Sequence, residues 1–167
     1  RTLVQDIGPM ADVTQKTGVV MEVMTFIGSS PIRQYVEEWS VELIRRRSVE
    51  AIAFGVKEGL PVTYVTEDTT RTPPSALCLC AAVGHATPDG ARNLVEFTKN
   101  LIDGMGAKVG IDWHGHDDRG FALANALAAM EAGADRIHGC VLGVGERVGN
   151  TSLEHLLRNL ERDGRYG

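Results

Sequence analysis

The chain has 167 residues, of which 43% are hydrophobic and 23% charged, and its formal net charge is −5. This length fits one domain with its own core, and the sequence predicts no membrane span, no signal peptide and no nucleic-acid partner. Three cysteines, an odd number in apolar stretches, indicate buried thiols in a reducing cytoplasm.

Five short apolar stretches predict buried parallel strands. They are bounded by turn signals and contain many β-branched residues, which is typical of strands covered on both faces. The predicted strands are Val19–Ile27, Pro61–Thr66, Ala76–Cys80, Lys108–Trp113 and Arg136–Leu142. Ala76–Cys80 carries the weakest pattern of the five.

Helical segments alternate with these strands. Proline or a capping residue marks the starts, and glycine marks the ends. The predicted helices are Thr2–Thr17, Pro31 to Gly59 with a break after Leu43, Pro88 to Gly104, Asp118 to Gly133, and a last one that Thr151 and Glu154 open as a capping box and that ends near Gly164. Strands and helices in alternation predict a parallel α/β fold.

One spacing conflicts with that fold. Parallel strands need a crossover of about a dozen residues or more, yet only about ten separate Thr66 from the next predicted strand. Pro73 and Pro74 prevent this segment from being helical throughout. Either Ala76–Cys80 is not a parallel neighbour, or a helix of roughly fifteen to twenty residues is missing from the sequence. We favour the missing helix.

The first group of candidate site residues follows the strand that ends at Trp113. His114 and His116 are two residues apart, and side chains at this spacing in an extended chain point to one face. Both imidazoles should converge beyond the carboxyl end of the strand, where α/β folds bind ligands. The pair predicts a divalent-metal site; the alternative is a polar loop that caps the next helix.

Two further polar loops follow predicted strands. Gly143–Asn150 holds Glu146 and Arg147 among glycines, and it is equally typical of a ligand-binding loop and of a tight turn. Thr66–Arg71 carries two adjacent carboxylates and an arginine, which suit acid–base work or anion binding but also an ordinary hydrated loop. Polar clusters at the ends of three strands are the pattern of an α/β-barrel enzyme.

These segments resemble the 2-isopropylmalate synthase family, which includes homocitrate and citramalate synthases. The paired HxH and GxGERxGN motifs carry the resemblance, which extends from about Val19 to Leu160. Three further segments match in the family's order: Thr25–Pro31, Thr66–Arg71 and Val83–Pro88. The resemblance implies an α/β fold of the (β/α)8 TIM-barrel type. Residues 1–167 would be a partial catalytic domain with about the last five strands, without the N-terminal strands and without a regulatory domain.

The resemblance also implies site residues and a reaction. His114, His116 and Asn150 would bind a divalent metal (Mg²⁺, Mn²⁺ or Zn²⁺), Glu67 and Glu146 would be catalytic, and Thr66, His85 and Arg147 would bind substrate. The implied reaction is a Claisen-type condensation of acetyl-CoA with a 2-oxo acid, which yields a 2-hydroxy diacid and CoA. It belongs to amino-acid biosynthesis, leucine included, in a cytoplasmic homodimer.

Three positions depart from the family. Met24 stands where relatives commonly carry a histidine, and Ala81 and Ala82 replace an Asp-Thr pair. The alternatives are a metal-dependent lyase of the hydroxymethylglutaryl-CoA lyase type and an inactive barrel fragment. Such lyases normally carry a cysteine in the glycine loop, whereas Cys140 precedes that loop here and is expected to be a core thiol. His138 is a further candidate for a place near the metal, and His155 is expected to be structural.

Overall fold

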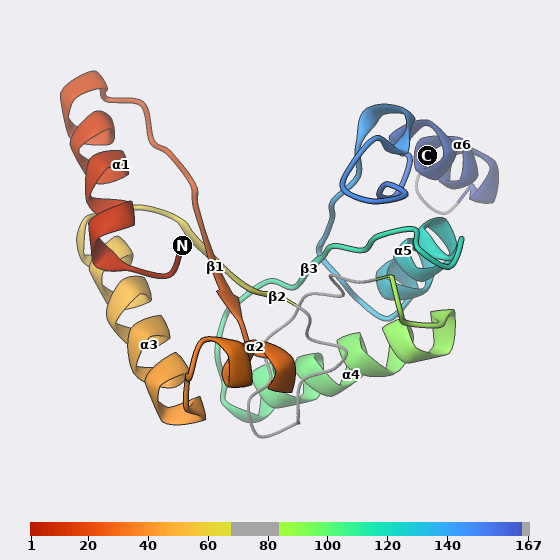
Figure 1. The fold of residues 1–167 in the computed structure, drawn as a ribbon. Helices are drawn as coiled ribbons and strands as arrows, with labels where there is room; N and C mark the ends of the chain where they lie inside the picture. Colours follow the sequence, from red (N-terminus) through yellow and green to blue (C-terminus); the bar gives the residue numbers. More distant parts are fainter. Residues whose placement is uncertain (68–83, 165–167) are drawn as a thin grey trace. The chain divides into compact units, whose positions relative to one another are not determined.

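The computed structural model describes residues 1–67 and 84–164 (Figure 1). They belong to two compact units, Arg1–Cys78 and Leu79–Gly167, which we take in turn. The predicted strand Ala76–Cys80, the departures at Ala81 and Ala82 and the missing crossover helix lie outside the described residues.

The first unit is built around two parallel strands joined by a helical crossover. Its elements are α1 (Val4–Thr17), β1 (Val23–Gly28), α2 (Pro31–Val36), α3 (Val41–Lys57) and β2 (Val62–Glu67). The strands pair in register from Val23 opposite Val62 to Gly28 opposite Glu67. A small core forms where α1 and α3 pack beside β1, from Ile7, Ala11, Val23, Ala51 and Leu60.

The predictions for α1 and β2 are confirmed to within about two residues, but β1 starts later than expected. Val19 and Val20 are 63% and 65% exposed and precede the strand. Val23 is the first residue of β1 with a partner in β2, since Val62 begins that strand. The prediction of a strand from Val19 is therefore wrong at its start.

The segment between the strands is two helices rather than one with a break after Leu43. The chain leaves helical geometry after α2, and Glu38 adopts a φ of +54°. Ser40 then starts α3, because its side chain accepts a hydrogen bond from the Leu43 N–H at 3.1 Å. The predicted break is thus several residues too late.

The second unit packs three helices around a short parallel pair. Its elements are α4 (Pro88–Gly104), β3 (Asp112–Trp113), α5 (Ala122–Glu131), β4 (Arg136–Ile137), the 3₁₀ turn η3 (Val141–Gly143) and α6 (Leu153–Asp163). Asp112 pairs with Arg136, and Trp113 pairs with Ile137. The core of this unit consists of Ala91, Val95, Ile111, Trp113, Ala126, Ala129 and Leu156. The bounds of α4 agree with the prediction, and Thr87 caps it through the Gly90 N–H.

Both strands of the second unit are shorter than predicted. The chain continues after β4 into η3, where Leu142 has a φ of +55°, so the prediction of a strand through Leu142 is wrong. Cys140, three residues after the end of β4, does not pair with β3 and pairs instead with the segment before α6, where its N–H donates to the Thr151 carbonyl at 2.9 Å. A change of pairing partner therefore ends the strand.

The starts of α5 and α6 also differ from the prediction. Asp117 Oδ1 accepts the Ala122 N–H at 2.8 Å, and α5 begins there rather than at Asp118. Ser152, not Thr151, caps α6, because its side chain accepts the His155 N–H. The Thr151 hydroxyl is buried and donates to the Ala122 carbonyl at 3.3 Å.

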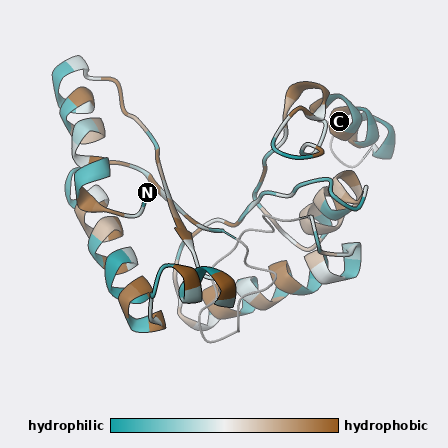
Figure 2. Ribbon diagram, viewed as in Figure 1, coloured by the Kyte–Doolittle hydropathy of each residue, from teal (hydrophilic) through white to brown (hydrophobic). Residues whose placement is uncertain are grey.

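The described elements are those of a parallel α/β fold. Both apolar and polar residues occur along α3 and α4 (Figure 2), as expected of helices that bury one face and expose the other. Residues 1–67 and 84–164 form two two-stranded sheets and no closed barrel. Within this part of the chain, no helix combines the length and apolar character needed to cross a membrane.

Candidate metal centre

The two histidines of the HxH motif converge directly after β3. Their Nε2 atoms lie 3.2 Å apart, and the ring planes are at 86° to each other. Two nitrogen ligands that share one ion, each about 2.1 Å from it, lie roughly 3.0 to 3.4 Å apart. The expected convergence of His114 and His116 is observed, and the separation of their nitrogens fits a single divalent cation.

Asn150 lies next to this pair in the fold. It forms an isolated antiparallel bridge with His116, and its Nδ2 donates to Cys140 Sγ at 3.3 Å. Its Oδ1 is buried and has no hydrogen-bond partner within the described residues. A buried amide oxygen without a donor is unfavourable, and oxygen is the ligand that hard divalent cations prefer. The amide therefore fits the predicted site.

The available donor set is two imidazoles and one amide. Across residues 1–67 and 84–164, histidine, cysteine and acidic residues form no three-membered group that could hold a metal. The amide of Asn150 is thus needed beside His114 and His116. Three protein donors leave room for oxygen atoms of water or substrate, as at open metal sites.

The electrostatic environment keeps His114 neutral. Burial lowers the pKa of His114 from 6.5 to about 4, because the ring loses water, and the neighbouring His116 and His138 act in the same direction. Glu146 opposes the shift by its negative charge. The neutral imidazole, with a free lone pair, is the form that binds metal ions.

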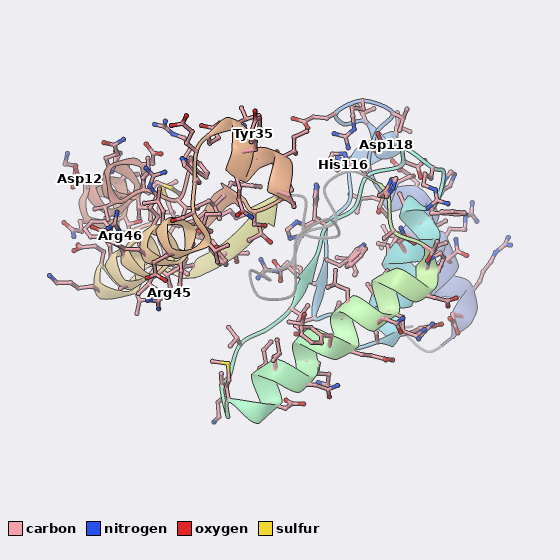
Figure 3. All side chains as sticks on the ribbon, turned by 60° about the horizontal axis from the view of Figure 1, so that its bottom comes forward. Asp12, Tyr35, Arg45, Arg46, His116 and Asp118 are labelled. Carbon is pink, nitrogen blue, oxygen red and sulfur yellow. The ribbon has the colours of Figure 1, made fainter. Side chains whose placement is uncertain are left out.

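The glycine loop Gly143–Asn150 is held against the HxH segment by two further contacts. The Asp117 N–H donates to the Gly149 carbonyl at 2.9 Å. Arg147 donates to both oxygens of Asp118, at 2.7 and 3.0 Å, and this ion pair lowers the pKa of Asp118. Asp118 lies close to His116 in the fold (Figure 3). Arg147 has a φ of +57°, a strained value for a residue with a side chain.

A second polar cluster lies next to the histidines. The sequence analysis names His138 as a candidate for a place near the metal, but it does not predict that Asp112 and Arg136 are its neighbours. His138 Nε2 lies 3.1 Å from Asp112 Oδ2, and Arg136 Nη1 lies 3.4 Å from the same oxygen. The His138 ring centroid is 5.7 Å from that of His114, so His138 lies near the histidine pair. The parallel register, which the sequence alone does not predict, places Asp112 opposite Arg136.

Two predicted residues, Glu67 and Thr66, belong to the first unit. Glu67 ends β2, and its carboxylate lies 3.5 Å from the guanidinium of Arg33. It borders a cleft of about 500 Å³, whose lining also includes Arg47 and Trp39. Thr66 is fully buried in β2, opposite Ile27 of β1.

Other predicted residues of the second unit have more exposed positions. The Glu146 side chain is 83% exposed, and His85 is exposed, with its carbonyl accepting a hydrogen bond from Arg119. His155 is an exposed residue of α6. Cys140, expected to be a core thiol, is only partly buried and contacts the amide of Asn150.

The comparison with protein families shows to which family the chain belongs. The HMGL-like family matches residues 3–166. The chain belongs to the HMGL-like family. Among its relatives, the 2-isopropylmalate synthase of Methanocaldococcus jannaschii is 35% identical over 157 residues, which cover 84% of this chain and 29% of that protein. The probable 2-isopropylmalate synthase of Methanopyrus kandleri is 34% identical over 155 residues, 83% of this chain and 30% of that protein. The resemblance predicted from the motifs is confirmed.

Solved structures share the fold of this HMGL-like chain. An HMG-CoA lyase from A. baumannii, in complex with coenzyme A and 3-methylmalate, has a TM-score of 0.71 at 18% identity, over 92% of this chain and 58% of that one. An HMG-CoA lyase from Brucella melitensis has a TM-score of 0.65 at 17% identity, over 92% of this chain and 62% of that one. The barrel type of α/β fold is supported, and the number of missing strands stays a prediction.

The HMGL-like chain spans about 30% of the length of the curated relatives. Enzymes of this family generally depend on a divalent metal, which agrees with the donor set of the candidate centre. The candidate centre lies within residues 114–150 of the second unit.

Proposed function

We propose that this HMGL-like chain is part of an acyltransferase that condenses acetyl-CoA with a 2-oxo acid, in the manner of the 2-isopropylmalate synthases. The two relatives above, at 34% and 35% identity, carry that name. The observation that supports the proposal most directly is the 3.2 Å approach of the His114 and His116 Nε2 atoms beside the oxygen of Asn150, which accepts no hydrogen bond from the residues that the structure describes.

In this proposal His114, His116 and Asn150 hold a divalent cation, Mg²⁺, Mn²⁺ or Zn²⁺. When bound, such a cation supplies Lewis-acid polarisation of the 2-oxo acid carbonyl. The protein keeps His114 uncharged by burial and keeps His116 94% shielded from solvent. Both features favour coordination over protonation and hydration of the rings.

The proposed condensation needs two proton transfers and one molecule of water. A proton leaves the methyl carbon of the thioester, that carbon bonds to the keto carbon, and the keto oxygen takes up a proton. Water then cleaves the thioester, so that the 2-hydroxy diacid and CoA are released. Glu67 and Glu146 are our candidates for the catalytic carboxylates. The charge of Glu146 acts on the His114 pKa, which supports a place within electrostatic reach of the centre.

The substrate-binding residues are proposals of the same kind. Thr66 is buried in β2, and His85 is exposed on the loop before α4. Both stay candidates for contacts to substrate. Arg147 donates two hydrogen bonds to Asp118, which favours a role in holding the glycine loop over direct substrate binding.

The second candidate function is cleavage of a carbon–carbon bond in an acyl-CoA substrate, the type of reaction that an HMG-CoA lyase catalyses. The lyase structures share the fold of this chain at 17% and 18% identity, which supports the architecture alone. The glycine loop Gly143–Asn150 contains no cysteine, and the Cys140 thiol before it is engaged by Asn150. These two features favour condensation.

The test is a CoA-release assay on the purified full-length protein. Acetyl-CoA is incubated with each of several 2-oxo acids and Mn²⁺, and free CoA is quantified by chromatography. We expect release that needs both the oxo acid and the metal, that His114→Ala abolishes, and that His155→Ala on the exposed face of α6 leaves unchanged. Absence of CoA release with every oxo acid, or activity only in the cleavage direction, would refute the proposal.

Two expectations from the resemblance accompany this proposal, a homodimer and a cytoplasmic location. Light scattering of the purified protein tests the first, since a dimer has twice the mass of the chain. Fractionation of the source cells tests the second.

A further inference from the structure

The side chain of Asn150 is confined by two neighbours. Cys140 Sγ accepts its Nδ2–H at 3.3 Å. The backbone of Gly145 approaches so closely that an added Cβ would overlap Nδ2 and would lie 2.8 Å from Cγ and 3.2 Å from Oδ1. A sulfur atom and a bare glycine backbone thus both crowd the nitrogen end of the carboxamide.

The orientation of this carboxamide decides whether it can bind a cation. A carboxamide has two ends of similar size, of which the oxygen is an acceptor and the NH₂ group a donor. Rotation of the amide by half a turn would offer the NH₂ group in place of the oxygen. A hydrogen bond to Cys140 Sγ directs the nitrogen toward the sulfur, and Oδ1 is left as the buried atom with no hydrogen-bond partner in residues 1–67 and 84–164.

The sulfur is itself held in place by the backbone. The Cys140 N–H donates to the Thr151 carbonyl at 2.9 Å, and the Cys140 carbonyl accepts the Leu153 N–H at 3.1 Å and the Gly143 N–H at 3.0 Å. Thr151 follows Asn150 directly in the sequence. The positions of the Cys140 sulfur and of the Asn150 amide are therefore coupled through one short stretch of backbone pairing.

We propose that Cys140 is a positioning residue of the metal centre, whose sulfur holds the Asn150 nitrogen and thereby sets Oδ1 as the atom offered to a divalent cation. This inference rests on the proposed function, because it assumes that Asn150 is a ligand. The sulfur acts through the amide, since cysteine forms no three-membered metal-binding group with histidine or acidic residues in the described part of the chain.

Mn²⁺ binding to the full-length protein tests the proposal, with the free ion followed by its electron paramagnetic resonance signal. Cys140→Ala should raise the dissociation constant for Mn²⁺ by about 10- to 100-fold, the usual effect of removing a partner that orients a ligand. Cys140→Ser should restore most of the affinity, because a hydroxyl oxygen accepts the same N–H. Val141→Ala, at a neighbouring side chain that is 66% exposed, is the matched control and should bind as the wild type does.

A double-mutant comparison separates positioning from a general loss of structure. If the sulfur acts through the amide, Cys140→Ala has no further effect on Mn²⁺ affinity in protein that already carries Asn150→Ala. Additive effects of the two substitutions, or wild-type affinity in Cys140→Ala, would overturn the proposal.

A readout without metal keeps this inference distinct from the proposed function. If the wild-type protein binds no Mn²⁺, the metal proposal fails, and the side-chain amide signals of Asn150 in nuclear magnetic resonance spectra still report on the sulfur contact. We expect Cys140→Ala to shift these signals and to speed their exchange with solvent, and Cys140→Ser to change them less. Unchanged amide signals in Cys140→Ala would show that the sulfur does not hold the amide.

Discussion

The close approach of Gly145 to Asn150 makes a single methyl group a sharp probe of the candidate centre. In Gly145→Ala the new Cβ would overlap Asn150 Nδ2 and lie 2.8 Å from Cγ, well inside van der Waals contact. The obstacle is the short side chain of Asn150 itself, so either this side chain rotates away or the loop moves. Both responses displace the amide oxygen from the histidine pair.

The expected cost follows from the size of the overlap. One methyl group forced into a packed site typically costs about 1 to 3 kcal/mol of folding free energy. Displacing one ligand should in addition weaken Mn²⁺ binding by about 10- to 100-fold. Denaturant unfolding of the metal-free protein measures the first quantity, and Mn²⁺ titration measures the second.

Gly104→Ala is the matched control, because the same methyl group is added in the same unit. Gly104 is the last residue of α4, and nothing lies within 4 Å of its added Cβ. This variant should be as stable as the wild type or more stable by about 0.4 to 1 kcal/mol, since alanine restricts the unfolded chain. Unchanged stability and Mn²⁺ affinity in Gly145→Ala would show that the tight contact does not hold the amide in place.

Three other predictions concern the second unit. Val95→Ala removes two methyl groups from a fully buried site and should cost about 2 kcal/mol in denaturant unfolding. The pKa of His114 is about 4 in the folded protein against an ordinary value of 6.5, so the unfolded chain takes up this proton first, and the free energy of unfolding should fall as the pH drops from 6.5 to about 4. His114→Gln should reduce this loss of stability. An equal dependence of stability on pH in the variant and the wild type would contradict the pKa shift. In a double-mutant cycle, Arg147→Ala and Asp118→Ala should show a coupling of about 0.5 to 1 kcal/mol, whereas additive losses would mean that the ion pair contributes nothing.

The sequence predicts the helices better than the strands. The apolar stripe and caps of α4 are local signals, and its bounds agree with the prediction. The length of a strand depends on its neighbour, and only Asp112 and Trp113 find partners in β4. The sequence also does not distinguish adjacent capping residues such as Thr151 and Ser152, since both have a hydroxyl group. Tertiary contacts decide which of the two caps the helix.

The residues of the candidate site also differ in how well the sequence predicts their positions. The convergence of His114 and His116 follows from the two-residue period of an extended chain, so the sequence predicts it. The place of Asn150 beside His116 is predicted only by the family resemblance, since the two residues lie more than thirty positions apart in the chain. The sulfur contact of Cys140 depends on the chain after β4 turning to pair with Ser152, which no local pattern indicates.

Three consecutive residues attach the HxH segment to the glycine loop, each in a different way: His116 by a backbone bridge to Asn150, Asp117 by its N–H to the Gly149 carbonyl, and Asp118 by its carboxylate to Arg147. Asp117 also starts α5 through its side chain. The spacing from the histidines to α5 is therefore constrained, because a residue inserted anywhere in this segment would displace at least one of these attachments. Homologous proteins should vary in length elsewhere, for example at the exposed turn around Met105.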